Sequence, residues 1–230
     1  MNRESYKQQQ RQAIRAVANR ETTASVVPFC SDFRADPRRC LTIIQFLPPA
    51  LATRIHQEII LPLSRFESWH HFYDLEEMHI TLQPIRKIAD PPAFNDSDIE
   101  GVKRHLGPHF AQFPAIQFDL EGVVVFPTSC AISALCGPEL QALLETGNAL
   151  LQKIGIPNDK SYADQAAVFG NITFCRFSKP PGPAFQSFCS ELAQRQLGQF
   201  CVNQVSLVDC NAVCAQESRR IHAQFRLAEN

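Results

Sequence analysis

The chain has 230 residues, 45% of them hydrophobic, and a formal net charge of −1. This length and hydrophobic content exclude a largely disordered protein and allow one large domain, or two small lobes, around a sizeable core. The polar start lacks the apolar core of a signal peptide, and no apolar run approaches the roughly 20 residues of a membrane span.

The first segment of the chain is basic. Residues 1–39 carry eight Lys or Arg and four acidic residues, whereas the remainder carries 14 basic and 19 acidic residues. A basic segment can contact nucleic acid, and its simplest interpretation is a solvated tail. Ala13, Ile14 and Val17 have helical spacing, which predicts a loose helix able to dock on the body. We therefore expect a basic N-terminal arm and linker over 1–38 and one folded domain over 39–230.

The domain alternates between strand-like and helix-like segments. Apolar, β-branched runs with period two predict strands, and apolar residues at helical spacing predict helices. The expected strands are 41–47, 76–88, 116–126, 131–136, 168–177, 200–210 and 219–227. The expected helices are 50–66, 98–113, 138–154 and 184–197. The chain therefore divides into two halves of similar content, and each half contains one strand with a short polar signature.

The two signatures have the same layout. The first is His79-Ile80-Thr81-Leu82, and the second, 92 residues later, is Asn171-Ile172-Thr173-Phe174. Alternate residues of a strand share a face, so the polar members of each signature point one way and the apolar members point to the core. An imidazole moves protons near neutral pH, and a neighbouring hydroxyl can donate to a phosphoryl oxygen. The pattern therefore favours phosphate chemistry.

In this layout the chain resembles the 2H phosphoesterases, the group that includes bacterial 2′-5′ RNA ligase-like proteins and cyclic phosphodiesterases. That family has two H-x-[T/S]-x motifs, one in each pseudo-symmetric lobe, across a central groove. The resemblance covers roughly 39–227 and includes the opening strand 41–47, the run 122–127 and the strand 205–208. It implies an α+β fold of two pseudo-symmetric lobes, each a mostly antiparallel sheet backed by helices, around a central groove.

The resemblance also implies roles for individual residues. His79 becomes a general acid or base, Thr81 and Thr173 become donors to the phosphate, and Asn171 stands where the second catalytic His is expected. Arg176, which follows the second motif, is expected to bind substrate. One His of the family activates the attacking oxygen and the other protonates the leaving oxygen, without a metal or other cofactor.

The asparagine leaves two functions open. An amide can hydrogen-bond to a phosphate or a water, but it cannot exchange a proton at neutral pH. The first function is a metal-independent phosphoesterase acting on RNA-related phosphoesters, either a 2′,3′-cyclic phosphate or a 2′-5′ linkage. The alternative is a catalytically impaired module that binds a nucleotide or an RNA end. A third possibility is an unrelated α+β domain in which the motif match is accidental.

Other histidines are weaker candidates. His222 lies on the wet face of the last expected strand and could stand in for the missing His. His70 and His71 are expected in a loop or at the surface. His105 and His109 have a metal-binding i, i+4 spacing but no evident third ligand, so a solvated helix face is the expected environment.

The sequence contains nine cysteines. They form no C-x-x-C pair and no zinc spacing with His, and several lie inside apolar runs where cysteine behaves as a small buried hydrophobe. The sequence therefore predicts reduced thiols and a cytoplasmic protein. It also predicts a monomer whose partner is RNA or a nucleotide, with no metal and no membrane contact.

Overall fold

One antiparallel sheet organises the computed structural model, which describes residues 2–22, 26–160 and 167–228. The strands run in the order β7-β4-β5-β6-β3-β1-β8-β9, and β2 pairs with β6. They are β1 (Arg39–Phe46), β2 (His71–Phe72), β3 (His79–Ala89), β4 (Ile116–Phe126), β5 (Ser129–Leu135), β6 (Gly170–Arg176), β7 (Gln196–Val202), β8 (Gln204–Cys210) and β9 (Arg220–Arg226).

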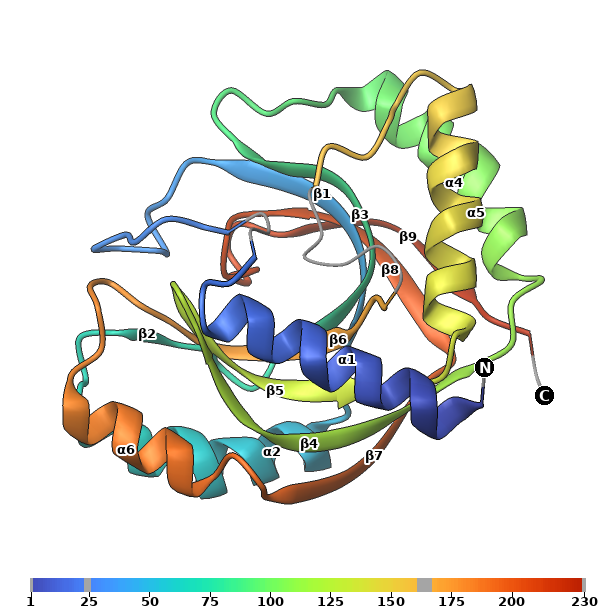
Figure 1. Ribbon diagram of the computed structural model, residues 1–230. Coiled ribbons are helices and arrows are strands. Elements are labelled where there is room, and N and C mark those ends of the chain that lie inside the picture. The colour runs from blue at the N-terminus through green and yellow to red at the C-terminus, as the bar shows by residue number, and fades with distance from the viewer. Residues whose placement is uncertain (1, 23–25, 161–166, 229–230) are drawn as a thin grey trace.

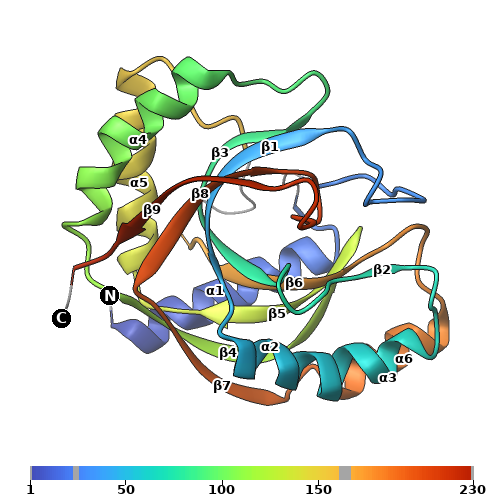
Figure 2. The ribbon, with the colours of Figure 1, turned by 180° about the vertical axis from the view of Figure 1, so that it is seen from behind.

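The helices lie outside the sheet (Figures 1 and 2). They are α1 (Arg3–Ala18), α2 (Pro49–Ile55), the π-helical turn η1 (His56–Ile60), α3 (Leu61–Ser64), α4 (Asp96–Phe110), α5 (Glu139–Lys153) and α6 (Pro183–Glu191). No helix among the described residues combines the length and the apolar composition that crossing a membrane requires.

The sheet has two halves that meet at a narrow seam. β3 and β6 pair only through Ile80 and Ile172, so the strands β7-β4-β5-β6 form one half and β3-β1-β8-β9 form the other. α4 packs on β9 and α5 on β3, whereas α6 packs on β4 and α3 on α6 (Figure 1). Each half is thus an antiparallel sheet backed by helices, and the predicted two-lobed α+β fold is confirmed.

One segment of the sequence prediction is wrong. The expected helix 184–197 ends at Glu191, and the expected strand 200–210 is two strands, β7 and β8, separated by Asn203. β7 pairs with β4 in one lobe and β8 pairs with β1 in the other, so the chain crosses between lobes at Asn203. Gly198, with φ of +87°, lies where the register shifts, and this irregularity removes the period-two pattern from β7.

The N-terminal arm is docked on the body rather than solvated. α1 packs across β4 and β5 (Figure 1), and Ile14 is buried. Lys7 forms an ion pair with Asp119, and Arg11 forms one with Glu121, so the acidic residues of β4 neutralise basic residues of the arm. The solvated-tail interpretation is therefore wrong for α1. The division of the chain at 38/39 stays a prediction.

Candidate functional site

A cavity of about 280 Å³ lies where the two lobes meet. All five residues that the sequence singled out line it: His79, Thr81, Asn171, Thr173 and Arg176. The structure therefore brings the two signatures to one place, although their chemical roles stay predictions.

The pairing at the seam explains this convergence. Ile80 of β3 is opposite Ile172 of β6, and both side chains are fully buried. Residues that flank a buried strand residue face the opposite side, so the polar neighbours of both isoleucines face the cavity. Because the strands are antiparallel, His79 lies on the same side of this pair as Thr173.

The surroundings of His79 fix its protonation. Its Nδ1 lies 2.6 Å from the backbone oxygen of Glu77. A carbonyl oxygen only accepts, so Nδ1 carries the proton and Nε2 of the neutral ring keeps its lone pair. Burial lowers the pKa of His79 to about 4; the Glu77 bond opposes this shift, and the charges of Arg176 and Arg219 add to it. At neutral pH His79 is thus an acceptor of protons.

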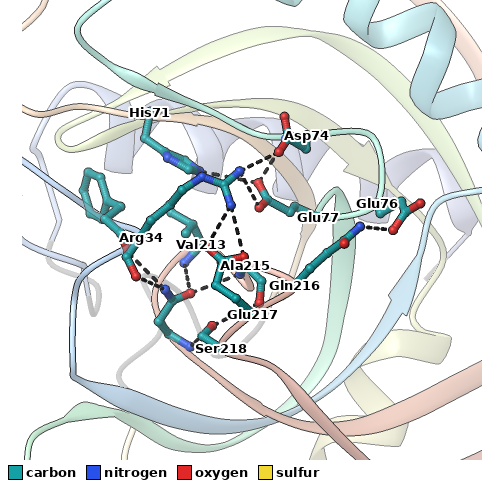
Figure 3. Close-up of polar contacts among 12 residues, drawn as sticks. Arg34, His71, Asp74, Glu76, Glu77, Val213, Ala215, Gln216, Glu217 and Ser218 are labelled. Carbon is teal, nitrogen blue, oxygen red and sulfur yellow. Dashed lines mark hydrogen bonds and ion pairs between the residues drawn. The ribbon is translucent and has the colours of Figure 1, made fainter.

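Behind His79, a polar network holds the loop that supplies the Glu77 oxygen. Figure 3 shows Arg34 reaching from the N-terminal linker between Glu77, Asp74 and Glu217. The Arg34 guanidinium lies 3.0 Å from Oε1 of Glu77, whose Oε2 accepts a bond from the backbone N–H of Asp74. Burial opposes ionisation of Glu77, but contacts with His71, Asp74 and Arg34 outweigh it and lower the pKa of this carboxyl.

Removing Arg34 tests this network. Arg34 and Arg195 have similarly exposed side chains, 40% and 42%, but Glu77 is 1% exposed and Glu58, the partner of Arg195, is 35% exposed. A buried charge left without its partner costs about 1–3 kcal/mol or more, whereas an exposed pair contributes about 0–1 kcal/mol. Urea denaturation of Arg34→Met should show the larger loss of unfolding free energy, and the matched control Arg195→Met the smaller one. Equal losses would show that the Arg34 network stabilises the fold no more than an exposed ion pair does.

Asn171 is oriented by its own motif. The hydroxyl of Thr173 donates to Oδ1 of Asn171 over 3.3 Å. This bond fixes the amide and leaves its N–H₂ group to donate. The resemblance implied that Thr173 donates to the phosphate. In the structure its single hydroxyl proton is instead directed to Asn171.

Four Lys or Arg residues are among the described residues that line the cavity: Arg86, Lys87, Lys160 and Arg176. Nε of Arg176 donates to the Tyr73 hydroxyl over 3.1 Å and to the backbone oxygen of Ala212 over 2.9 Å, which holds the guanidinium in place. Lys160 also lines the cavity, and burial and the charge of Arg176 lower its pKa. Two neighbouring cations at one cavity favour an anionic ligand. Lys160 could not be identified from the sequence, because it lies outside the two strands that carry the signatures. Only the folding of the chain brings it to the site.

Several apolar side chains also line the cavity. Phe126 and Phe169 stack at a centroid distance of 6.3 Å, and Val26 and Val27 of the linker lie on the wall with them. The N-terminal segment therefore contributes directly to the walls of the site.

The other histidines have structural environments. His70, expected in a loop or at the surface, is buried between Phe177 and Phe185 and lies 2.7 Å from a Glu67 carboxylate oxygen. His109, expected on a solvated face, is buried and lies 3.2 Å from the Leu143 backbone oxygen. His70 does lie in a loop, between α3 and β2, but it is buried rather than at the surface. The solvated face expected for His109 was wrong, because the neighbouring elements that cover these rings come from distant parts of the chain.

His222, which was expected as a possible stand-in for a second histidine, lies away from the cavity. Its Nε2 lies 2.6 Å from a carboxylate oxygen of Asp209 on the neighbouring strand. His222 is not among the described residues that line the cavity.

Comparison with known proteins gives the fold. No protein-family model matches the chain, and no curated protein matches it in sequence. The structure of TT0787 of Thermus thermophilus is similar with a TM-score of 0.59 and 14% identity, covering 83% of this chain and 99% of that one. A structure described as a phosphoesterase gives 0.54 and 13%, with the same shares. Apo LigT of E. coli gives 0.52 and 13%, covering 84% of this chain and 99% of LigT.

These similarities confirm the fold that the resemblance implied. The chain shares the fold of these three structures, and it has Asn171 at the position where the resemblance implies a second His. About a sixth of the chain lies outside the matched part, while the similar structures are covered almost completely.

Proposed function

We propose that this chain is a phosphoesterase of RNA-related substrates and that His79 is its general base. The observation that carries the proposal is the convergence of both motifs, one from each lobe, on one cavity that Arg176 and Lys160 also line. Phosphoryl oxygens are anionic, and side-chain cations, amides and hydroxyls are the groups that bind them. Crystal structures of LigT with 3′-AMP and with NADP+ support a nucleotide as the ligand.

In the proposed reaction, Nε2 of His79 accepts the proton of an attacking water. Thr81 and the Asn171 amide donate to phosphoryl oxygens, and Arg176 offsets the negative charge that develops on them. Asn171 can hydrogen-bond to the leaving oxygen but cannot protonate it, so the reaction relies on a good leaving group. A 2′,3′-cyclic phosphate or a 2′-5′ linkage is the proposed substrate, and no metal takes part in the proposal.

The pH profile tests the role of His79. A base must be unprotonated, and the pKa of His79 is lowered to about 4. We expect kcat/KM for a 2′,3′-cyclic nucleotide to stay level from about pH 8 down to about pH 5 and to fall about tenfold per unit below about pH 4. An acidic limb centred near the ordinary histidine pKa of about 6.5 would contradict this environment.

The second candidate function is binding without turnover, which Asn171 favours. Measuring both the turnover and the binding of nucleotides distinguishes the enzyme from the binding module. A folded protein that binds 3′-AMP, but hydrolyses a 2′,3′-cyclic nucleotide no faster than its His79→Ala variant, would be a binding module. Turnover that exceeds that of the variant supports the enzyme.

A further inference from the structure

A pair of thiols faces the cavity from the side of β1 and β8. Cys40 and Cys210 are directly opposite each other in the register of these two strands, and their Sγ atoms are 3.8 Å apart. Both line the cavity, as does Cys214. All nine cysteines of the chain are free thiols in the structure.

The charges around this pair make its two sulfurs unequal. The hydrogen bond from Cys210 and the charges of Arg176 and Lys160 lower the pKa of Cys40. The bonds of Cys210 with Cys214 and Cys40 raise its own pKa well above the usual range. The thiolate is the form that reacts with oxidants, so Cys40 is the attacking sulfur and Cys210 is the neutral partner beside it.

We propose that Cys40 and Cys210 form a dithiol site that a peroxide converts to a disulfide at the wall of the cavity. The Cys40 thiolate attacks one peroxide oxygen, so an S–O bond forms, the O–O bond breaks, and hydroxide leaves. Cys210 sulfur then attacks the Cys40 sulfenic acid, the S–S bond forms, and the S–O bond breaks. The second hydroxide takes the Cys210 proton and leaves as water. The two sulfurs lose two electrons, and the peroxide is reduced to hydroxide and water.

Strand pairing permits this bond. Opposed residues of antiparallel strands have Cα atoms about 4.5–5.5 Å apart, inside the range of about 4.4–6.8 Å that a disulfide spans. The Sγ atoms therefore need to approach only by side-chain rotation. Because a disulfide cannot ionise, oxidation removes a thiol whose thiolate form would compete with a phosphoryl group for Arg176 and Lys160.

The chain contains a matched internal control. Cys130 and Cys189 have Sγ atoms 3.7 Å apart, which is nearly the same separation. Both are buried in the hydrophobic core, neither is among the described residues that line the cavity, and burial raises the pKa of Cys130 well above its usual range. The two pairs are therefore matched in the separation of their sulfurs, but they differ in charge, in access and in backbone geometry, since Cys130 lies on β5 and Cys189 on α6.

The experiment treats the reduced, folded full-length chain with hydrogen peroxide and follows each cysteine over time by alkylation and non-reducing peptide mapping. We expect the Cys40–Cys210 cross-link to form about tenfold faster than Cys130–Cys189, or more. Cys40→Ser should abolish it, and Cys201→Ser, which removes an exposed thiol, should leave it unchanged.

Equal rates at the two pairs, or a Cys210–Cys214 cross-link that leaves Cys40 free, would overturn the proposal. The comparison of the two pairs uses the wild-type chain, so it holds even where Cys40→Ser fails to fold. It measures thiols alone and does not depend on turnover of a phosphoester.

Discussion

His79→Ala should lower turnover of a 2′,3′-cyclic nucleotide by about 10²–10⁴-fold, the usual contribution of one positioned acid–base group. His79 lies on the cavity with its Nδ1 bonded to the Glu77 backbone oxygen, which leaves Nε2 to accept a proton. No other histidine is among the described residues that line this cavity. Initial rates from chromatography of the opened nucleotide measure the loss.

His222→Ala is the matched control for this substitution. His222 is also half-buried on a strand and also forms a short polar contact, but with Asp209 and away from the cavity. Its replacement should leave the rate within about twofold of wild type, because it contributes no proton transfer. Equal rates for wild type and His79→Ala, with both proteins folded by circular dichroism, would exclude His79 as the base.

Asn171→His is expected to have a comparable effect in the opposite direction. It restores a proton donor at the position where the leaving oxygen is proposed to lie, and a full general acid could recover up to about 10²–10⁴-fold in turnover. Turnover of the same cyclic nucleotide measures the gain. Addition of His79→Ala to this variant should remove the gain.

The new histidine needs a partner that orients it. His79 is held by the backbone oxygen of the residue two positions before it. The corresponding residue before position 171 is Phe169, which lies at the cavity, so its backbone oxygen could orient an introduced ring in the same way. The gain falls short of its upper limit where this orientation is imperfect.

Asn171→Gln is the control for size and polarity, because an amide of greater reach still exchanges no proton. It should give no gain. A similar increase in Asn171→Gln and Asn171→His would attribute the effect to shape. High wild-type turnover that Asn171→His destroys would mean that the amide itself has a role, such as holding the attacking water.

The parts of the site that depend on the alternation of polar and apolar residues along a strand could be predicted from the sequence. Ile80 and Ile172 are apolar residues inside polar signatures, and period-two patterning alone places their neighbours on the opposite face. The repeated layout predicted that His79 and Asn171 come from equivalent positions, and the pairing at the seam places both at one cavity.

The remainder depends on long-range contacts that no local pattern contains. Arg34 and Glu77 are 43 positions apart in the sequence, and their ion pair requires the linker to cross the lobe that contains β3. The burial of His70 comes from Phe185, which belongs to a helix far along the chain. β7 lacks regular alternation because of its irregular register at Gly198, so its residues resemble a helix end.

The most direct measurement of the central claim is a histidine NMR titration of the full chain with 3′-AMP. The chain has seven histidines, and His79 is expected to show a neutral ring protonated at Nδ1 with a pKa of about 4. Addition of 3′-AMP should shift the His79 resonances and raise this pKa, because the phosphate places negative charge beside the ring. If the protein is saturated with 3′-AMP and neither the resonances nor the pKa of His79 change, the assignment of this cavity as a phosphoester site is contradicted.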